Sequence, residues 1–461
     1  MSIALPGLDE MSKRRYDVVV AGAGVAGSVA SKLIAERGFK VALIESRPSS
    51  SVGTKVCGDG VGIHEFNLAG VALPRAEVER TVRGVKFYSP PENMIFAILG
   101  PGVTLNRHAF GQRLLQEAQD QGVEFFSESA VTRALLEEDK VAGVVARHLG
   151  RLEEFRAAVT IDATGITAAV RKTLPPSWPV AERLDRSRIG VGYREYRRVT
   201  SEFEDYCSLY YDWEAAPGGY CWIIPKKGNL VNTGLLVPWS HSIATGLESR
   251  FEKFLRENSA LRDSEFVRSE IGLVPLDHPL PTAVAGGFLT IGDAACHANP
   301  LNGDGIGPAM LSAKIAADVV GSCLGRGVSS VDALWRFNVE YMRVQGHRYS
   351  GNRVFSDFMR GLKAGEVVSL LKALGVKKEY TSGDLFSELS YLNRLQMILR
   401  VGVRPRFISH LLATIRRMRA VSTHCREYPT EPSRFNRWRT ILDGYIGTQI
   451  RRPHTSGIIS S

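Results

Sequence analysis

The sequence predicts an α/β fold, α+β in overall composition, with three parts: a parallel-sheet domain, an antiparallel-sheet domain and a helical C-terminal domain. Three observations lead to this prediction. A glycine-rich turn joins a short apolar strand to a helix near the N-terminus. A run of β-rich segments over residues 189–237 then breaks the alternation of strands and helices. Beyond residue 330 the pattern predicts helices and no further strand.

The stretch Tyr16–Glu45 reads YDVVVAGAGVAGSVASKLIAERGFKVALIE. It predicts a buried strand over Val18–Ala21, a helix over Val25–Glu36 and a second strand over Val41–Ile44. The turn after the first strand has the spacing G-x-G-x-x-G, which is typical of a Rossmann-like dinucleotide-binding unit.

Four residues of this unit have separate physical roles. Gly22 permits the tight turn, Gly24 lets a pyrophosphate approach the backbone, and Gly27 lets the helix pack closely on the strand. Glu45 follows the second strand at the spacing expected for a carboxylate that binds ribose hydroxyls. The unit predicts a bound dinucleotide, and from these residues alone FAD and NAD both stay open.

The composition is that of an ordinary globular protein, with 461 residues of which 44% are hydrophobic and 23% charged. No apolar run reaches the roughly 18 residues that span a bilayer, and the N-terminal apolar stretch is too short for a secretory signal. The six cysteines form no C-x-x-C pair, which argues against zinc and against a disulfide framework. We therefore expect a cytoplasmic protein without a metal site.

The net charge of +10 resides in the C-terminal region. Residues 391–461 contain 13 arginines, no lysine and three acidic residues, so the rest of the chain is neutral overall. In the predicted helix Phe407–His424, apolar residues lie on one face and arginines on the other. Such a helix suits an anionic membrane surface or an acidic partner, or else it faces the core with its arginines in solvent. The aromatic residues of this region are scattered, so we expect no nucleic-acid partner.

Two short motifs stand out for their chemistry. KVCGDG (Lys55–Gly60) predicts an irregular loop near the dinucleotide, and in the alternative interpretation its Cys57 only packs. PGGYCWIIP (Pro217–Pro225) predicts a strand with Tyr220 and Trp222 on one face, because side chains alternate along a strand. The alternative for this pair is two aromatic residues in a core.

The stretch Gly286–Val320 predicts a strand over Leu289–Ile291 and then a helix that opens on the glycine-rich turn NGDGIG. The N-terminus of that helix is a second place where a polar cofactor group can bind. His297, between the strand and the helix, either faces a cofactor or caps a turn.

The remaining elements follow from hydrophobic periodicity. The expected strands lie near 82–100, from Val123, and near 130–136, 141–148 and 155–162, and the expected helices span Arg107–Gln121, Val331–His347, Val354–Leu374, Asp384–Arg400 and Phe407–His424.

Three stretches, taken in order, resemble flavoproteins of the p-hydroxybenzoate hydroxylase fold: GAGVAG, LNRHAF and GGFLTIGDAACHANPLNGDGIGPAM. The resemblance implies FAD rather than NAD, with Asp293 at the ribityl chain and Arg107 near the phosphates. Because there is one dinucleotide fingerprint, no dedicated NAD(P)H domain is expected. The residues that we expect to contact FAD are Gly22, Gly24, Ala26, Gly27, Glu45, Cys57, Gly58, Arg107, Gly165, Asp293, Gly303, Gly305 and Ile306.

The resemblance also implies domain boundaries. The expected domains are a discontinuous FAD-binding domain (14–81, 101–188 and 270–328), an antiparallel β substrate domain (82–100 and 189–269) and a helical, Arg-rich C-terminal domain (329–461).

Within that fold, KVCGDG and PGGYCWIIP resemble the marker motifs of the geranylgeranyl reductase family, whose aromatic motif is P-x-x-Y-x-W-x-F-P. Ile224 stands where that motif has phenylalanine, and the matching residues are Pro217, Tyr220, Trp222 and Pro225. The resemblance implies an FAD-dependent reductase that saturates isolated double bonds of geranylgeranyl chains in archaeal-type ether phospholipid precursors.

The implied reaction protonates an alkene carbon and delivers hydride from reduced flavin. Tyr220 and Trp222 are expected to stabilise positive charge on carbon, and Cys57, or else Tyr220, to donate the proton. The isoprenoid lipid is expected in a tunnel between the antiparallel sheet and the helical domain. The implied partners are an electron donor, such as ferredoxin or NAD(P)H, and an anionic membrane surface that the arginine-rich region contacts peripherally.

Two rival functions follow from the same residues. A flavin-dependent monooxygenase or halogenase shares the fold, and a halogenase motif W-x-W-x-I-P matches Ile224 and Pro225. KVCGDG argues against it, and so does Tyr220 at a position where a halogenase has tryptophan. The second rival is a flavin-bound protein without enzymatic activity whose basic C-terminal region binds a nucleic acid or a membrane.

Overall fold

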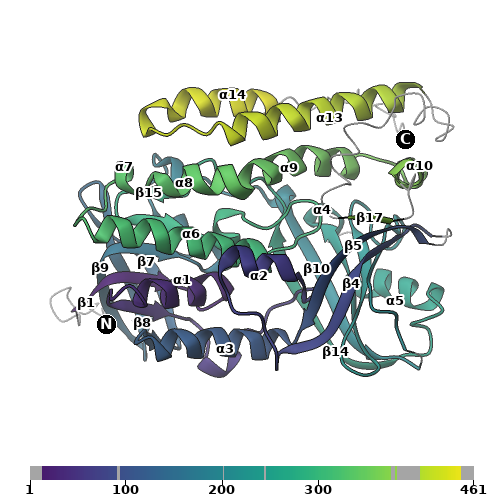
Figure 1. Cartoon of the computed structure of the whole chain (residues 1–461), viewed down its shortest axis with the longest axis horizontal. Coiled ribbons are helices and arrows are strands. Elements are labelled where there is room, and N and C mark those ends of the chain that lie inside the picture. Colours follow the sequence, from purple (N-terminus) through teal and green to yellow (C-terminus); the bar gives the residue numbers. More distant parts are fainter. Residues whose placement is uncertain are drawn as a thin grey trace, which may run out of the picture.

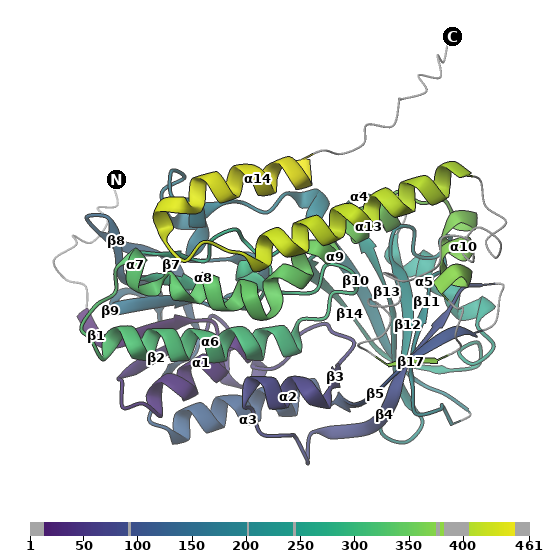
Figure 2. The ribbon, with the colours of Figure 1, turned by 45° about the horizontal axis from the view of Figure 1, so that its top comes forward.

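The computed structural model of the chain describes residues 13–90, 94–200, 202–242, 246–374, 379–381 and 405–447. These residues form an eight-stranded sheet built on parallel strands, a nine-stranded and mainly antiparallel sheet, and a layered set of helices. Figure 2 shows the two sheets side by side, with helices α6 (Ile306–Leu324) and α1 (Val25–Ala35) beside the first of them. The predicted fold class is confirmed.

The first sheet has the strand order β15–β16–β9–β1–β2–β6, and β7 and β8 form a hairpin on β9. Strands β16, β9, β1, β2 and β6 run parallel, because helices connect most of them. The bounds are β1 Lys13–Ala21, β2 Val41–Ile44, β6 Glu124–Phe126, β7 Ser129–Glu137, β8 Lys140–His148, β9 Arg151–Asp162, β15 Val284–Ala285 and β16 Phe288–Thr290.

Helices α1, α3 (Arg107–Asp120) and α6 pack beside this sheet, and α1 contacts both of the others. Their apolar faces form the largest buried cluster of the described chain together with the strands they cover. Helix α1, strand β2 and helix α3 agree with their predicted bounds to within one residue, whereas β1 begins at Lys13, five residues before the predicted start at Val18.

The second sheet has the order β14–β10–β13–β12–β11–β4–β5–β17, with β3 paired to β5. Its bounds are β3 Gly60–Gly62, β4 Val78–Tyr88, β5 Met94–Leu105, β10 Ile189–Arg198, β11 Cys207–Tyr210, β12 Tyr220–Pro225, β13 Leu230–Pro238, β14 Glu265–Pro275 and β17 Glu379–Thr381. Strand β17 corrects the expectation of no strand beyond residue 330. Three residues carry no readable periodicity, and only their parallel pairing with β5 makes them a strand.

Two of the predicted C-terminal helices are broken into shorter ones. The first becomes α7, α8 and a π-helical turn over Met342–Gly346, and the chain then continues directly into α9. The second is interrupted after Arg360, where the carbonyl of Leu362 leaves the helix and accepts the indole N–H of Trp213 at 3.0 Å. The bounds are α2 Ile63–Ala69, α4 Trp239–Ser242, α5 Leu247–Glu257, α7 Val331–Leu334, α8 Arg336–Tyr341, α9 His347–Arg360, α10 Ala364–Leu374, α13 Pro405–Arg426 and α14 Phe435–Gly447. The helix expected over 384–400 lies outside the described residues.

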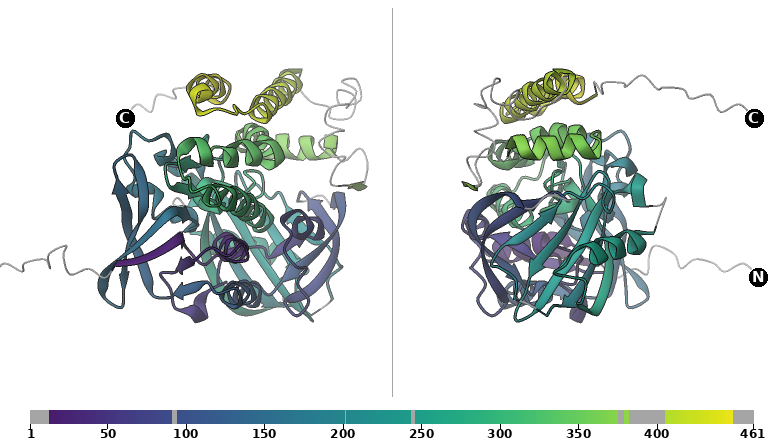
Figure 3. Two further views of the ribbon diagram at one scale, coloured as in Figure 1. Left: turned by 60° about the vertical axis from the view of Figure 1, so that its left-hand side comes forward. Right: turned by 90° about the vertical axis from the view of Figure 1, so that its right-hand side faces the viewer.

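Helices α13 and α14 form an outermost layer over α8 and α9 (Figures 1 and 3). Helix α13 packs on α9 through its apolar face, where Leu411, Ile415 and Val421 are buried. Its exposed face carries arginines, among them Arg416 and Arg419. The apolar face of α13 therefore packs on the core while Arg416 and Arg419 are in solvent, and contact with a membrane surface or an acidic partner stays a prediction. Within the described residues, no helix is both long and apolar enough to cross a membrane.

Candidate active site

A cavity of about 800 Å³ lies where the two sheets meet, which is a volume typical of small-molecule and cofactor sites. Its wall joins residues from the parallel sheet, from the loop after β2 and from the antiparallel sheet. Of the residues expected at the site, those that line it are Gly22, Gly24, Ala26, Glu45, Cys57, Gly58, Arg107, Gly165, Tyr220, Trp222, Asp293, Gly303, Gly305 and Ile306. Gly27 does not line it, which agrees with its expected role in packing.

The three glycines of the first turn differ in what surrounds them. A Cβ at Gly27 would lie 1.8 Å from the carbonyl oxygen of Gly22, so this position requires glycine for close packing. Gly22 has a φ of +99°, which favours glycine. A Cβ at Gly24 would meet no atom within 4 Å, and Gly24 faces the cavity. The turn therefore leaves open space at the helix N-terminus, where a phosphate can approach.

Glu45 ends β2 with its side chain buried against this turn. One carboxylate oxygen accepts the backbone N–H of Ala23 at 2.9 Å, and the other accepts that of Arg47 at 3.0 Å. These bonds fix the carboxylate at the cavity wall, and Oε2 keeps a lone pair that can accept a hydroxyl, whereas Oε1 also accepts Ser46 and the Arg47 side chain.

Arg107 is the second residue whose surroundings point to a ligand. It begins helix α3, after Asn106 caps the helix by accepting the N–H of Ala109 at 3.0 Å. The side chain lines the cavity and is only 7% exposed, yet its Nε and Nη1 atoms have no hydrogen-bond partner. Burial lowers the pKa of Arg107, because the charged guanidinium is desolvated. A buried cation with unpartnered donors suits an anion such as a pyrophosphate.

Asp293 lines the cavity from a short 3-10 turn, Gly292–Ala295, before helix α6. Its carboxylate forms an ion pair with Lys55 of the KVCGDG loop. The carboxylate can accept hydroxyl groups of a ribityl chain, and together with the Gly22 turn, Glu45 and Arg107 it gives the cavity the donors and acceptors that FAD requires. The residues present therefore fit FAD.

The loop that contains Cys57 is held against the antiparallel sheet. The carbonyl oxygen of Cys57 accepts Nη1–H of Arg194 at 2.7 Å and Nδ2–H of Asn232 at 2.8 Å. A Cβ at Gly58 would lie 2.8 Å from Cδ1 of Ile224, so the glycine lets the loop approach β12 closely. Burial, with the nearby charge of Asp59, raises the pKa of the Cys57 thiol, so the thiol keeps its proton at neutral pH.

Tyr220 and Trp222 lie on the same face of β12, as strand alternation predicts, and both line the cavity. Their ring centroids are 6.2 Å apart. The hydroxyl of Tyr220 donates to the carbonyl of Asn302, and the indole N–H of Trp222 donates to Oδ1 of Asn232 at 2.9 Å. Burial raises the pKa of Tyr220. These two rings pack in a core cluster and also form part of the cavity wall, so both interpretations of the pair hold.

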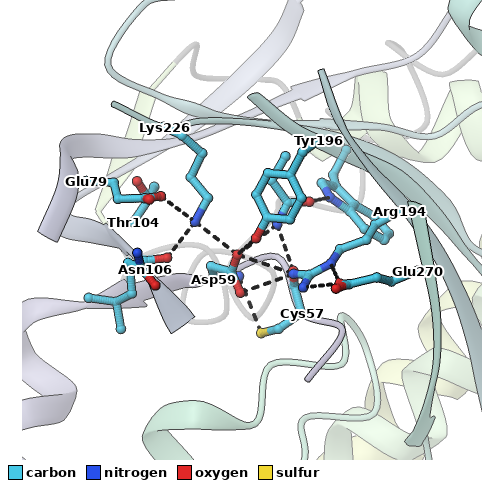
Figure 4. A network of polar contacts seen from close by, with 12 residues as sticks. Cys57, Asp59, Glu79, Thr104, Asn106, Arg194, Tyr196, Lys226 and Glu270 are labelled. Carbon is cyan, nitrogen blue, oxygen red and sulfur yellow. Dashed lines mark hydrogen bonds and ion pairs between the residues drawn. The ribbon is translucent and has the colours of Figure 1, made fainter. Parts of the chain in front are cut away.

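A buried polar cluster, which we call the Asp59 hub, supports the loop from behind (Figure 4). It consists of Asp59 and the four residues that donate to its carboxylate: Arg194, Tyr196, Lys226 and Asn232. Asp59 and Lys226 are both fully buried, and their charged atoms are 2.9 Å apart. Tyr196 and Asn232 donate to the carboxylate at 2.9 and 3.0 Å. Outer carboxylates of Glu79 and Glu270 balance Lys226 and Arg194.

Sequence reasoning missed every donor of the Asp59 hub. The available signal was weak: Asn232 interrupts the otherwise apolar strand LVNTGLLVP, and Lys226 directly follows the strand of Tyr220 and Trp222. A polar side chain within a fully buried strand needs a partner, and this requirement could have marked both positions.

A carboxyl pair at the cavity wall was also missed. Glu65 on α2 and Asp304 before α6 both line the cavity and share a side-chain hydrogen bond. Burial raises the pKa of Glu65 to about 9 and that of Asp304 to about 6. At neutral pH this pair therefore holds a proton between its two carboxyl groups.

His297 does not line the cavity. Its ring stacks on Tyr341 with centroids 3.8 Å apart, and burial lowers its pKa to about 3. Of the two roles considered for His297, contact with a cofactor receives no support from this position. Within the part of the chain that the structure describes, no group of His, Cys, Asp and Glu is placed to hold a metal ion.

Comparisons with known proteins agree with this geometry. Two family models match the chain: the geranylgeranyl reductase catalytic domain over residues 189–274 and the FAD dependent oxidoreductase over residues 17–173. The digeranylgeranylglycerophospholipid reductase of Sulfolobus acidocaldarius is 31% identical over 95% of this chain and 98% of its own length. A digeranylgeranylglycerophospholipid reductase of Methanococcoides burtonii is 27% identical over 85% of this chain and 94% of its own length.

Solved structures share the fold. A geranylgeranyl bacteriochlorophyll reductase-like protein from Thermoplasma acidophilum has a TM-score of 0.76 at 22% identity, covering 88% of this chain and all of that one. The myxobacterial chondrochloren halogenase has a TM-score of 0.63 at 19% identity, covering 87% of this chain and 97% of that one.

Proposed function

Because the chain belongs to the geranylgeranyl reductase family of FAD-dependent oxidoreductases, we propose that it saturates isolated C=C bonds of geranylgeranyl chains in archaeal-type ether phospholipid precursors. The observation that carries this proposal is the shared cavity. The residues that fit FAD line the same cavity as the Cys57 thiol and the rings of Tyr220 and Trp222.

In this proposal Gly22, Gly24, Glu45, Arg107 and Asp293 hold FAD. When bound and reduced, FAD supplies the hydride. The protein excludes water from the substrate through the apolar wall of the antiparallel sheet, and it keeps the alkene within reach of a proton.

Three side chains supply the rest of the chemistry. Cys57 holds a proton on Sγ at neutral pH, because its thiol pKa is raised, and it is our first candidate for the proton donor. Tyr220, whose hydroxyl is engaged by the carbonyl of Asn302, is the second. The faces of Tyr220 and Trp222 stabilise the positive charge that develops on carbon, by about 1–2 kcal/mol in a desolvated site.

The lipid chain is proposed to lie between the antiparallel sheet and the C-terminal helices. Apolar side chains from both sides pack on one another there in one buried cluster, including Phe96 of β5, Phe355 and Phe358 of α9 and Leu411 of α13, and the lipid chain is proposed to displace some of these contacts. The exposed arginines of α13 are proposed to contact anionic lipid headgroups. Cosedimentation with vesicles containing phosphatidylglycerol, at low but not at high salt, tests this contact, and equal binding to neutral vesicles would contradict it.

The test of the reaction is mass spectrometry of the lipid product. Full-length protein loaded with FAD and chemically reduced is incubated with a geranylgeranylated ether phospholipid. We expect the mass of the lipid to rise in steps of two hydrogens, and an unchanged lipid under a competent reductant would refute the proposal. Reduced ferredoxin and NAD(P)H, compared in the same assay, identify the class of electron donor.

The same assay decides the rival flavin-dependent function. A monooxygenase or halogenase would add oxygen, chlorine or bromine to an acceptor, whereas a reductase adds hydrogen alone. The fold shared with the chondrochloren halogenase does not separate these reactions, but the products do.

A further inference from the structure

Asn232 connects the two motifs that carry the proposed chemistry, although it belongs to neither. It lies on β13, is fully buried and does not line the cavity. Its Oδ1 accepts the indole N–H of Trp222 at 2.9 Å. Its Nδ2 donates to the carbonyl of Cys57 at 2.8 Å and to the carboxylate of Asp59 at 3.0 Å.

We propose that Asn232 is a positioning residue that fixes the Cys57 thiol and the Trp222 ring relative to each other at the cavity wall. The inference rests on the proposed function, in which Cys57 donates the proton and Trp222 stabilises the resulting charge. Asn232 acts only through these two residues, because its side chain does not reach the cavity.

The strand pairing brings Asn232 next to Trp222. Strand β12 is antiparallel to β13, with Trp222 opposite Gly234 and Ile224 opposite Asn232, so Asn232 is the diagonal neighbour of Trp222 on one face. A Cβ at Gly234 would lie 2.6 Å from Cζ2 of Trp222. Glycine at this position therefore leaves the space in which the indole lies with its N–H directed at Asn232.

The bonding pattern requires an amide. The side chain must offer one acceptor to the indole N–H and two donors to the carbonyl and carboxylate oxygens, and only Asn and Gln offer both. Aspartate, which has the same shape, would lose both donors and place a second carboxylate beside Asp59. Alanine would leave the buried indole N–H of Trp222 without a partner.

The fold does not depend on Asn232 to the same extent. The carbonyl of Cys57 still accepts Arg194 at 2.7 Å, and Asp59 keeps Tyr196 and Lys226. Strands β12 and β13 remain paired through their backbones. Removal of the amide should therefore change where the thiol and the ring lie while the cavity and its lining persist.

The first measurement is the steady-state kinetics of FAD-loaded Asn232→Ala with a geranylgeranylated ether phospholipid. We expect kcat to fall about 10- to 100-fold, because small misplacement of reacting groups has effects of that size, and KM to change by less than about twofold. The matched control is Asn229→Ala in the turn of the same hairpin, where the amide is exposed and bonds only the carbonyl of Val199. This control should retain wild-type kcat.

A double-mutant cycle with Trp222→Phe separates positioning from general destabilisation. Phenylalanine keeps an aromatic face but lacks the N–H, so Asn232→Ala should cost less than about threefold in kcat in that background. An equal factor in both backgrounds, or an unchanged kcat, would overturn the inference. If Asn232→Ala does not retain FAD, Asn232→Gln replaces it in the cycle, because it keeps the amide and moves it by one methylene.

A spectroscopic measurement tests the inference independently of the reaction. Asn232→Ala should change tryptophan emission in the wild-type background and leave it unchanged in the Trp222→Phe background. If the wild-type protein does not reduce the lipid, the proposed function fails while this result still tests Asn232. If emission does not change in the wild-type background, the positioning role fails even when the lipid is reduced.

Discussion

The Gly22 turn and the Asp59 hub are both at the cavity, but they are built in different ways. The Gly22 turn belongs to a unit of thirty consecutive residues, Tyr16–Glu45. Its main constraints are steric, because a Cβ at Gly27 would lie 1.8 Å from the carbonyl oxygen of Gly22. The hub takes its donors from β10, from β13 and from the residue after β12, and its constraints are electrostatic. We expect the stability of the Gly22 turn to suffer more from added side-chain volume than from a change of charge. The stability of the Asp59 hub should suffer more from a change of charge than from a change of volume.

The largest effect should follow from Asp59→Asn. The substitution keeps the shape but removes the fully buried negative charge between Lys226 and Arg194, which then keep only the more exposed carboxylates of Glu79 and Glu270. We expect the free energy of unfolding to fall by about 3–5 kcal/mol, as measured by urea denaturation of the FAD-loaded protein. The control is Glu265→Gln, whose pair with Arg198 is largely exposed and whose loss should cost less than about 1 kcal/mol. Similar losses in the two variants would mean that the hub is not electrostatic.

Gly27→Ala should have the next largest effect. The added methyl group collides with the Gly22 carbonyl, which is backbone and moves only with the whole turn, so we expect a loss of about 1–3 kcal/mol. Gly24→Ala is the matched control, because its methyl group would meet no atom within 4 Å. The melting temperature of the FAD-free protein should fall for the first variant only. A fall for both would show that the turn tolerates no added volume anywhere.

Arg107→Met should weaken FAD binding about tenfold or more, equivalent to roughly 1.4 kcal/mol, because the unpartnered guanidinium atoms lose their anion. The FAD-free protein should be no less stable than wild type, since it no longer buries an unpaired charge. Arg113→Met on the same helix is the control. It should keep FAD affinity but lower the stability of the FAD-free protein, because Arg113 pairs with Glu77 and Glu117. Fluorescence titration with FAD measures the change in affinity, and thermal unfolding of the FAD-free protein measures the change in stability. Undiminished FAD affinity in the Arg107 variant would remove this residue from the cofactor site.

The smallest effect concerns pH and the carboxyl pair. The pKa of Glu65 is raised to about 9 in the folded protein, above that of an unfolded glutamic acid near 4.5. The unfolded chain therefore releases this proton first, so the stabilisation present below pH 4.5 is lost as pH rises toward 9. Glu65→Gln cannot titrate at this position, so its melting temperature should fall less than that of the wild type between pH 5 and pH 9. Parallel pH profiles for the two proteins would contradict the raised pKa.

The sequence predicts the parts that are built from consecutive residues, such as the Gly22 turn, better than the parts that are built from distant segments, such as the Asp59 hub. Helix α1, strand β2 and the end of strand β1 were predicted closely, because their periodicity and glycine spacing are local, whereas the polar residues Lys13–Asp17 hid the start of β1. Residues from six separate segments, including Cys57, Tyr220 and Asp293, were expected at one site, and they do line one cavity. This grouping came from resemblance to a family, since no local pattern predicts which distant segments meet.

The residues that were missed are those whose roles depend on distant partners. Asn232 lies within β13 and Lys226 directly follows β12, and neither has a local partner that reveals its role. Only the fold brings them to Asp59, more than 160 positions away in the chain. The break between α9 and α10 was missed for the same reason, because Trp213, which bonds Leu362, lies far from it in sequence. Helical periodicity continues through the break and therefore hides it.

The location of the Asp59 hub behind the cavity wall has a consequence for how such an enzyme can diversify. Arg194, Tyr196, Lys226 and Asn232 do not line the cavity, whereas apolar side chains such as Val82, Leu209, Ile224 and Leu236 do. Exchange of these apolar residues changes the shape of the cavity without removing a hydrogen bond of the hub. New chain lengths or branching patterns in the substrate can thus be selected one wall position at a time, on a scaffold that keeps the reacting groups in place.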